Sequence, residues 1–383
     1  MRGGERKRGR KAVRILICPD SFKGTLSARE AAEAMAAGAR RALGEDARVR
    51  LLPLGDGGEG SIDCFLSADA EERYREVTGP YGERLRARWL FFPGTKSAYV
   101  ESAEAAGLTR TARRETALAT SFGVGELIKE AAKEADRILL GLGGSATSDM
   151  GLGMASALGF VFRDAEGKSF VPTGASLSRV ASFERPPEPL PAIHALSDVE
   201  NPLCGPLGAA AVYGPQKGAD PETVERLDRG MAHASALIDP HKSALPGAGA
   251  AGGMGYAVLA LLGGSLGPGI GEIARVLGLE EAVRESDLVL TGEGSFDRQS
   301  LMGKAVGGVS SIAKEYGVPL YVLSGVAAGS GEIYEKGVTA VWPLTRYRPA
   351  SLPDGEETRR ALKDHTEALL RTVKAAEEAA SRR

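Results

Sequence analysis

The strongest constraint on the fold is the stretch Gly141–Gly159, in which glycines and hydroxyl side chains follow a short apolar run. That run, Arg137–Leu140, predicts a buried strand, and the residues after the glycines predict an apolar helix. A strand that leads through a glycine-rich turn into a helix is typical of a phosphate-binding loop, because glycine lets the backbone approach an anion and the helix N-terminus offers free N–H groups. A loose dinucleotide fingerprint and a tight turn with close helix–strand packing explain the same pattern, so these interpretations stay open.

The composition is that of a globular protein without a basic surface. The chain has 383 residues, a formal net charge of −2 and 43% hydrophobic residues, which favours about two domains. The charge excludes nucleic-acid and membrane-surface proteins that depend on a basic excess. Its three cysteines are far apart and form no CxxC pair, so neither a disulfide framework nor a zinc site is indicated. With no recognisable secretory signal or membrane span, we expect a cytoplasmic protein with small-molecule partners and an undetermined oligomeric state.

The two ends of the chain share a strand–helix rhythm that the middle interrupts. After the first strand, Ser27 and Glu30 form a capping box that predicts the start of a helix. Five apolar runs at the two ends predict parallel strands: Val13–Cys18, Arg48–Leu54, Asp287–Leu290, Pro319–Leu323 and Ala340–Leu344. We therefore predict an α/β fold in which residues 1–60 and 287–383 form a flavodoxin-like, doubly wound parallel sheet, interrupted by a second α/β domain inserted over residues 61–286.

The inserted domain begins with a different pattern, in which apolar residues alternate with period two. This alternation predicts strands at Tyr74–Thr78, Arg84–Phe92 and Ala98–Ser102, of which the first two form an antiparallel hairpin. Helical patterns follow at Ala117–Lys133, Pro221–Ile238 and Glu272–Glu285.

Charged residues follow three of the predicted strands. Ligands of open parallel sheets bind beyond the carboxyl ends of the strands, so the loops at these ends are the first candidates for a site. The loops contain Asp20 with Lys23, Asp56 with Glu59, and Glu293 with Asp297. Several carboxylates with a lysine at one edge suggest Mg²⁺ and phosphate chemistry. A single acidic loop residue is more often merely solvated, but three such loops together make that explanation weaker.

The inserted domain adds a comparable polar set. Asp149 follows the glycine-rich turn, and Asp198 and Asn201 follow a short predicted strand. Lys217 lies in a glycine-flanked turn, where a lysine can meet an oxyanion as a point charge. Lys304 begins a predicted helix, a position that disfavours a cation unless an anion lies nearby. Ordinary surface exposure explains either lysine as well.

Several chemistries are excluded by missing motifs. The chain has no GxxxxGK[ST], and its literal GxGxxG at Gly247–Gly252 follows Pro246 rather than a strand. The four histidines are scattered, with no HExxH pattern and no local triad. A carboxylate is therefore the expected proton acceptor.

Short motifs over most of the chain resemble those of a known family, the bacterial glycerate kinases that phosphorylate D-glycerate with ATP. Their order and number carry the resemblance: Pro19-Asp20-Ser21-Phe22-Lys23-Gly24, Asp56-Gly57-Gly58-Glu59-Gly60, Gly143-Gly144-Ser145-Ala146-Thr147, Asn201-Pro202-Leu203, Gly214-Pro215-Gln216-Lys217-Gly218-Ala219, Gly249-Ala250-Ala251-Gly252-Gly253 and Thr291-Gly292-Glu293-Gly294. The resemblance implies the two-domain fold inferred above, with the active site in the cleft between the domains. It also implies ATP and Mg²⁺ as cofactors and phosphorylation at the 2-hydroxyl in most members, while the sequence leaves the 2- and 3-positions open.

Roles for individual residues follow from this resemblance together with the loop positions. Asp56 or Asp198 would take the hydroxyl proton, and Glu293 and Asp297 would hold Mg²⁺. Lys23 is expected to act in catalysis, and substrate binding is expected from Asp20, Ser21, Glu59, Asn201 and Lys217. Phosphate or nucleotide binding is expected from Gly143, Gly144, Ser145, Ala146, Thr147, Asp149 and Lys304.

The chain departs from the family pattern at a few positions beside these residues. Family members commonly have Asn and Gly where this chain has Ser148 and Met150, and Gly where it has Arg298. Two other classes of function were considered. A nicotinamide-dependent dehydrogenase would use Asp164 or Glu166 as the acid about 20 residues past the glycines, and a non-catalytic regulator would keep the ligand site without the reaction.

Overall fold

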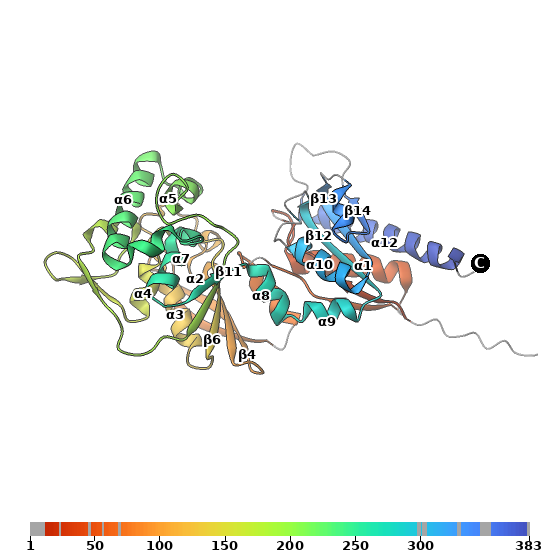
Figure 1. Cartoon of the computed structure of the whole chain (residues 1–383), viewed down its shortest axis with the longest axis horizontal. Coiled ribbons are helices and arrows are strands. Elements are labelled where there is room, and N and C mark those ends of the chain that lie inside the picture. The colour runs from red at the N-terminus through yellow and green to blue at the C-terminus, as the bar shows by residue number, and fades with distance from the viewer. Residues whose placement is uncertain are drawn as a thin grey trace, which may run out of the picture. The chain divides into compact units, whose positions relative to one another are not determined.

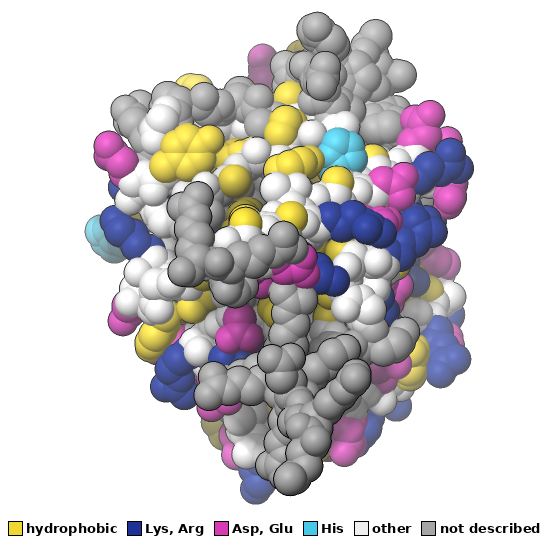
Figure 2. All heavy atoms as spheres, turned by 90° about the vertical axis from the view of Figure 1, so that its right-hand side faces the viewer, with side chains coloured by type: hydrophobic (Ala, Val, Ile, Leu, Met, Phe, Trp, Pro, Cys, Tyr) yellow, Lys and Arg dark blue, Asp and Glu magenta, His cyan; other side chains and the backbone are white. Residues whose placement is uncertain are grey.

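The computed structural model describes residues 12–22, 24–44, 47–55, 57–67, 70–296, 300, 305–327, 331–344 and 354–380. The chain forms two compact units (Figure 1), Met1–Gly55 with Ala274–Arg383, and Asp56–Ile273. We refer to them as the first and the second unit. In the space-filling view of Figure 2, basic and acidic side chains are interspersed over the face shown, as the small net charge leads one to expect.

A five-stranded parallel sheet forms the centre of the first unit. Its spatial order is β14-β13-β12-β1-β2, which is the flavodoxin-like order predicted from the sequence. The strands are β1 (Arg14–Ile17), β2 (Arg48–Leu51), β12 (Leu288–Phe296), β13 (Leu320–Ala327) and β14 (Ala340–Pro343). In β1, Ile15, Leu16 and Ile17 are all buried, because a central parallel strand is covered on both faces.

The helices of the first unit are α1 (Ala28–Leu43), α9 (Leu279–Arg284), α10 (Ala305–Tyr316), α11 (Glu332–Glu335) and α12 (Gly355–Ala380). Helix α1 begins as predicted, with the Ser27 hydroxyl accepting from the Glu30 N–H and the Glu30 carboxylate accepting from the Ser27 N–H. Gly38 lets α12 approach α1, since a Cβ there would lie 2.2 Å from the carbonyl oxygen of Lys363. The two chain ends are thus packed against each other.

The second unit is built on a six-stranded mixed sheet of order β11-β10-β6-β5-β4-β3. Its strands are β3 (Glu71–Thr78), β4 (Arg84–Phe92), β5 (Ser97–Glu101), β6 (Arg137–Gly141), β10 (Ala192–Leu196) and β11 (Ser265–Gly267). The predicted antiparallel hairpin is confirmed as β3–β4, and β5, β6, β10 and β11 run parallel. A small antiparallel sheet adds β7 (Val161–Arg163), β8 (Ser169–Phe170) and β9 (Ser182–Glu184).

The helices of the second unit are α2 (Ser102–Ala106), α3 (Phe122–Ala131), α4 (Leu152–Ala157), α5 (Ala209–Tyr213), α6 (Pro221–Ile238) and α7 (Ala250–Ala260), and α8 (Gly269–Val276) leads into the first unit. The 3₁₀ turns are η1 (Ser61–Ser67), η2 (Leu108–Arg110), η3 (Gly174–Arg179), η4 (Pro215–Lys217) and η5 (Pro240–Ala244). None of the helices described is both long and apolar enough to span a bilayer.

Two helix predictions were wrong in their bounds. The helix expected from Ala117 begins only at Phe122, because residues 116–118 form a turn instead. The helix expected over Glu272–Glu285 is two helices, α8 and α9, because Gly278 adopts a left-handed conformation with φ of 64° between them.

Candidate active site

A cavity of about 200 Å³ lies at the carboxyl ends of β6 and β10, within the second unit. It is lined by six segments that are separate in sequence. The lining consists of Gly57, Gly58, Leu108, Leu142–Ser145, Leu196–Val199, Tyr213, Gln216, Lys217, Ala250 and Ala251. The cavity therefore occupies the position where ligands of parallel sheets bind.

The loops around the cavity touch through their backbones, and this requires glycine at particular positions. A Cβ on residue 143 would lie 2.4 Å from the Cα of Gly58. Gly57 has φ of 83°, and a Cβ there would lie 2.7 Å from the Cβ of Leu196. The glycine-rich motifs at 57–60 and 141–144 thus serve to bring the loops together beside the cavity.

The turn after β6 presents unused backbone donors. The Ala146 N–H donates to the carbonyl oxygen of Ala106 at 2.7 Å, and the Leu108 N–H donates to the carbonyl oxygen of Gly144 at 2.9 Å. Among the residues described, the N–H groups of Gly144 and Ser145 have no protein acceptor. Among the described residues the predicted anion-binding turn therefore has two available donors. The Ala146 N–H is already bonded to Ala106, and the phosphate contact expected for Ala146 stays a prediction.

Lys217 is buried at this cavity, with 3% of its surface exposed. Its Nζ donates to Ser145 Oγ at 3.0 Å and to the carbonyl oxygen of Thr147 at 2.8 Å. Burial lowers the pKa of Lys217 to about 7, and the charge of Asp149 opposes this shift. A lysine that is buried without an ion-pair partner among the described residues is a natural receptor for an anionic ligand.

Asp149 has a different place from the one predicted. Its carboxylate is 0% exposed and accepts from Ser121 N at 2.7 Å, Ser121 Oγ at 2.8 Å, Gly151 N at 3.0 Å and Gly153 N at 3.3 Å. Burial raises the pKa of Asp149, against the effect of these hydrogen bonds. The carboxylate thus occupies the N-terminal N–H groups of α4, where an external phosphate was expected. The nucleotide contact expected for Asp149 stays a prediction. The Thr147 side chain is also fully buried.

Asp198, Asn201 and Glu59 all lie near the cavity, but only Asp198 borders it. The Asp198 carboxylate is exposed and accepts from the Gly269 N–H at 3.1 Å. Asn201 Nδ2 donates to Leu207 O, and its Oδ1 accepts from the Tyr213 hydroxyl at 2.6 Å. Asn201 thus holds Tyr213, which lines the cavity, and Glu59 is exposed with Thr109 as its partner.

The remaining predicted residues that the structure describes belong to the first unit. Asp20 Oδ1 accepts from the Ser21 N–H at 2.6 Å, and the Asp20 N–H donates to the carbonyl oxygen of Gly292 at 2.8 Å. Asp20 therefore follows β1, and the buried Glu293 lies within the neighbouring strand β12. Four predicted residues lie outside the described residues: Lys23, Asp56, Asp297 and Lys304.

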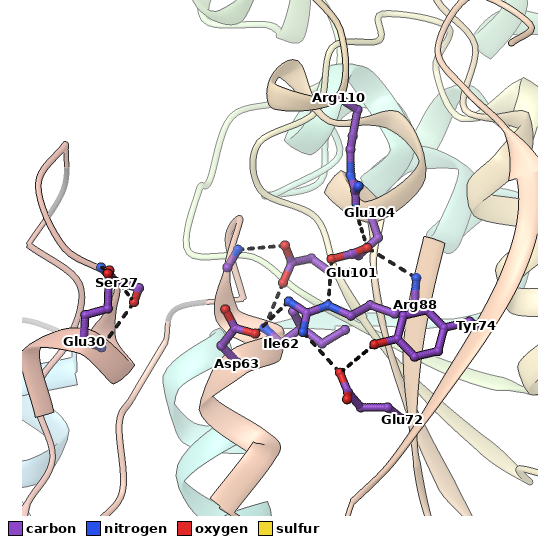
Figure 3. A network of polar contacts seen from close by, with 11 residues as sticks. Ser27, Glu30, Ile62, Asp63, Glu72, Tyr74, Arg88, Glu101, Glu104 and Arg110 are labelled. Atoms are coloured by element: carbon purple, nitrogen blue, oxygen red, sulfur yellow. Dashed lines mark hydrogen bonds and ion pairs between the residues drawn. The ribbon is translucent and has the colours of Figure 1, made fainter. Parts of the chain in front are cut away.

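A polar network beside the cavity was missed by the sequence analysis (Figure 3). Glu101, the last residue of β5, accepts from the N–H groups of Gly60 and Ile62. Arg88 on β4 contacts Asp63, Glu72 and Glu104 in the same network. The rule that singled out acids after the predicted strands applies equally to Glu101, but Glu101 was counted as part of a strand.

A divalent metal site can be tested only in part. No group of three or more His, Cys, Asp or Glu side chains forms a metal-binding cluster in the described part of the chain. Kinases typically hold Mg²⁺ with one or two carboxylates and the phosphates of the nucleotide, so a single carboxylate such as Glu293 fits that chemistry.

Known proteins resemble this chain over most of its length. A model of the Glycerate kinase family matches residues 15–374. The chain belongs to the glycerate kinase family. It is 39% identical over 348 residues to Glycerate 2-kinase of Escherichia coli strain K12, covering 87% of this chain and 90% of the relative. It is 37% identical over 358 residues to Glycerate kinase of Bacillus subtilis strain 168, covering 89% and 92%.

A solved structure matches the fold. The crystal structure of a protein assigned as glycerate kinase 2 from Salmonella typhimurium LT2 superposes with a TM-score of 0.81 at 38% identity, covering 96% of this chain and all of that one. Membership of the glycerate kinase family decides against the dehydrogenase and the non-catalytic regulator considered from the sequence. The enzyme is thus a phosphotransferase family member with the predicted α/β fold.

Proposed function

We propose that the protein transfers the γ-phosphoryl group of ATP to the 2-hydroxyl of D-glycerate, forming 2-phosphoglycerate. The family supports ATP-dependent phosphorylation of glycerate, and the name of the Escherichia coli relative, Glycerate 2-kinase, supports the 2-position. The single observation of this chain that carries the proposal is the buried Lys217 in a small cavity, because it offers a positive charge to a small anion.

The cavity is assigned to glycerate rather than to the nucleotide. Its volume of about 200 Å³ is below the roughly 300–1,000 Å³ of pockets that enclose drug-sized ligands, and suits a three-carbon acid. Lys217 Nζ would pair with the glycerate carboxylate, and the N–H groups of Gly144 and Ser145 would donate to its oxygens. Buried charge-assisted hydrogen bonds of this kind hold a carboxylate in one orientation.

A carboxylate beside the cavity would take the proton from the attacking hydroxyl. Asp198 borders the cavity directly, and Asp56 precedes Gly57, whose backbone also borders it. Phosphoryl transfer needs little covalent work from the protein, so the main requirement is that the hydroxyl, base and phosphoryl group are aligned. Asp20, Ser21, Lys23 and Lys304 keep their predicted roles in binding and catalysis as part of this proposal.

Mg²⁺ is proposed as the metal, with Glu293 and Asp297 as the residues that would hold it. When bound, Mg²⁺ neutralises charge on the β- and γ-phosphates. Glu293 is buried at the carboxyl-terminal part of β12 and is hard, anionic and oxygen-based, as this cation requires.

A coupled assay of ADP release tests the function most directly. The purified protein is supplied with ATP, Mg²⁺ and a panel of small hydroxy acids that includes both enantiomers of glycerate, and the product is identified by NMR. We expect the highest kcat/KM for D-glycerate and a phosphoryl group on O2. A phosphoryl group on O3 would contradict the position, and no ADP release with glycerate would contradict the function.

A further inference from the structure

Glu101 accepts two hydrogen bonds from the loop that forms one wall of the cavity. Its Oε1 accepts from Gly60 N at 2.7 Å and its Oε2 accepts from Ile62 N at 2.9 Å, while only 2% of the residue is exposed. Both oxygens of one carboxylate are thus occupied by backbone donors of a segment that is distant in sequence (Figure 3). A carboxylate can accept two such bonds at once, whereas an amide can accept on one side only.

The 57–62 loop packs closely against the backbone of a neighbouring loop at the cavity. Gly57 and Gly58 line the cavity, and Gly58 packs against Gly143 so closely that a Cβ on residue 143 would clash with it. The loop is closed on itself by a bond from Gly57 N to Ser61 Oγ at 3.1 Å. A displacement of Gly60 would therefore change the shape of the cavity at Gly57 and Gly58.

We propose that Glu101 is a positioning residue for phosphoryl transfer, which holds the 57–62 loop so that the cavity wall is in place for glycerate. This inference rests on the proposed function. Glu101 does not line the cavity itself, so it would act through the loop and not by touching the substrate.

Charged side chains also lie beside this loop. Arg88 Nη2 donates to Asp63 Oδ1 at 2.6 Å, and Arg88 Nε donates to Glu104 Oε1 at 3.0 Å. Glu104 is buried like Glu101 and lies in the adjoining helix α2. Within the described residues, its carboxylate accepts from Arg88 and Arg110 and makes no bond to the backbone of the 57–62 loop. Glu104 thus provides a matched control for the burial and charge of Glu101.

The experiment compares Glu101→Gln with Glu104→Gln in the full-length protein. For Glu101→Gln, we expect kcat/KM for glycerate to fall by about 100-fold, the loss that a displacement of about 1 Å can cause, with a raised KM for glycerate. Amide hydrogen exchange at Gly60 and Ile62 should accelerate. Glu104→Gln should lower the melting temperature while leaving kcat, KM and the exchange at these amides close to the wild-type values.

Glu101→Asp is included as a second variant that keeps the charge but shortens the reach, in case the Gln variant does not fold. Wild-type kcat and KM in a folded Glu101 variant would overturn the inference, as would an equal loss in Glu104→Gln. Failure of the proposed function is a separate outcome: the wild-type protein would then release no ADP with glycerate, while the hydrogen-exchange comparison would still report whether Glu101 holds the loop.

Discussion

Lys217 Nζ donates a hydrogen bond to the carbonyl oxygen of Thr147 at 2.8 Å in a buried environment, so the lysine is held by neutral acceptors. Its other bond is to Ser145 Oγ at 3.0 Å. Neutral acceptors stabilise an ammonium group less than a carboxylate does, and burial consequently lowers the pKa of Lys217 to about 7. Among the described residues, Lys217 has no ion-pair partner, and an arriving anion would supply one.

Glycerate binding should take up a proton at pH 8. Because the pKa of Lys217 is lowered to about 7, the lysine is mostly neutral in the free protein at that pH, and a bound carboxylate raises its pKa again. Isothermal titration calorimetry in two buffers of different ionisation enthalpy should show uptake of nearly one proton per glycerate, and affinity should weaken as the pH rises above 7.

Lys217→Arg is the control for that experiment, because arginine keeps its charge at every accessible pH. Any binding that remains in this variant should be independent of the buffer. A wild-type binding enthalpy that is the same in both buffers at pH 8 would contradict a neutral Lys217.

The proposed base can be found by removing each carboxylate in turn. We expect Asp56→Asn or Asp198→Asn to lower kcat by roughly 100-fold or more, the contribution of a positioned general base. Glu200→Gln changes an exposed acid two positions from Asp198 and should leave kcat unaltered. Full kcat in both aspartate variants would remove both proposed bases.

Asp149→Asn should destabilise the protein without direct loss of a ligand contact. The amide of the variant retains one acceptor oxygen, but its NH2 group would face N–H groups that bond to the Asp149 carboxylate in the wild-type protein. We therefore expect a loss of about 2 kcal/mol in the free energy of unfolding. Urea denaturation measures it. Asp220→Asn is the control, since Asp220 is an exposed N-cap of α6 and asparagine caps a helix equally well; equal losses in the two variants would contradict the role of Asp149.

Gly143→Ala should lower the activity by more than its effect on the stability of the protein would explain. The added Cβ would lie 2.4 Å from Gly58 Cα, so the 57–60 loop must move away from the cavity. Gly271→Ala in α8 meets no atom within 4 Å and should stabilise the helix by up to about 1 kcal/mol. Steady-state kinetics with both variants test this prediction. An active Gly143→Ala enzyme with unchanged KM would show that the cavity still binds glycerate when the loops at residues 58 and 143 lie further apart.

Met150→Gly tests a departure from the family pattern. Met150 has a positive φ of 60°, a conformation that glycine adopts freely, yet its side chain is fully buried. Relief of the backbone strain gains about 1–2 kcal/mol, while loss of a buried methionine costs about 2–5 kcal/mol. We expect a net decrease in stability by chemical denaturation, and a more stable variant would show that strain outweighs packing here.

The sheet order of the first unit could be predicted because the strand–helix rhythm leaves few topologies. Strands β1 and β12 are adjacent although almost the whole inserted segment separates them in sequence, and this followed from the handedness and shortness of α/β connections. The division of α8 from α9 at Gly278 could not be predicted, since one glycine within an amphipathic pattern is tolerated in many helices.

At the site, the sequence patterns indicated which residues lie at the cavity, but they did not indicate which partners those residues contact. Lys217 and Gly143–Ser145 were selected from separate motifs, and the structure brings them to one cavity. The inward direction of the Asp149 carboxylate depends on Ser121, which is distant in sequence and has no signature of its own. Glu101 was overlooked for a related reason, because its partners are backbone N–H groups, which every sequence offers.

The packing of α12 on α1 has a consequence for synthesis on the ribosome. Strands β1 and β2 leave the exit tunnel first, but their sheet and the cover of α1 are completed only by β12–β14 and α12 at the other end of the chain. At about 5–20 residues per second, translation of the intervening residues takes on the order of tens of seconds. During that interval the nascent N-terminal segment exposes an apolar surface, and it is the part of this protein for which a ribosome-associated chaperone would matter most.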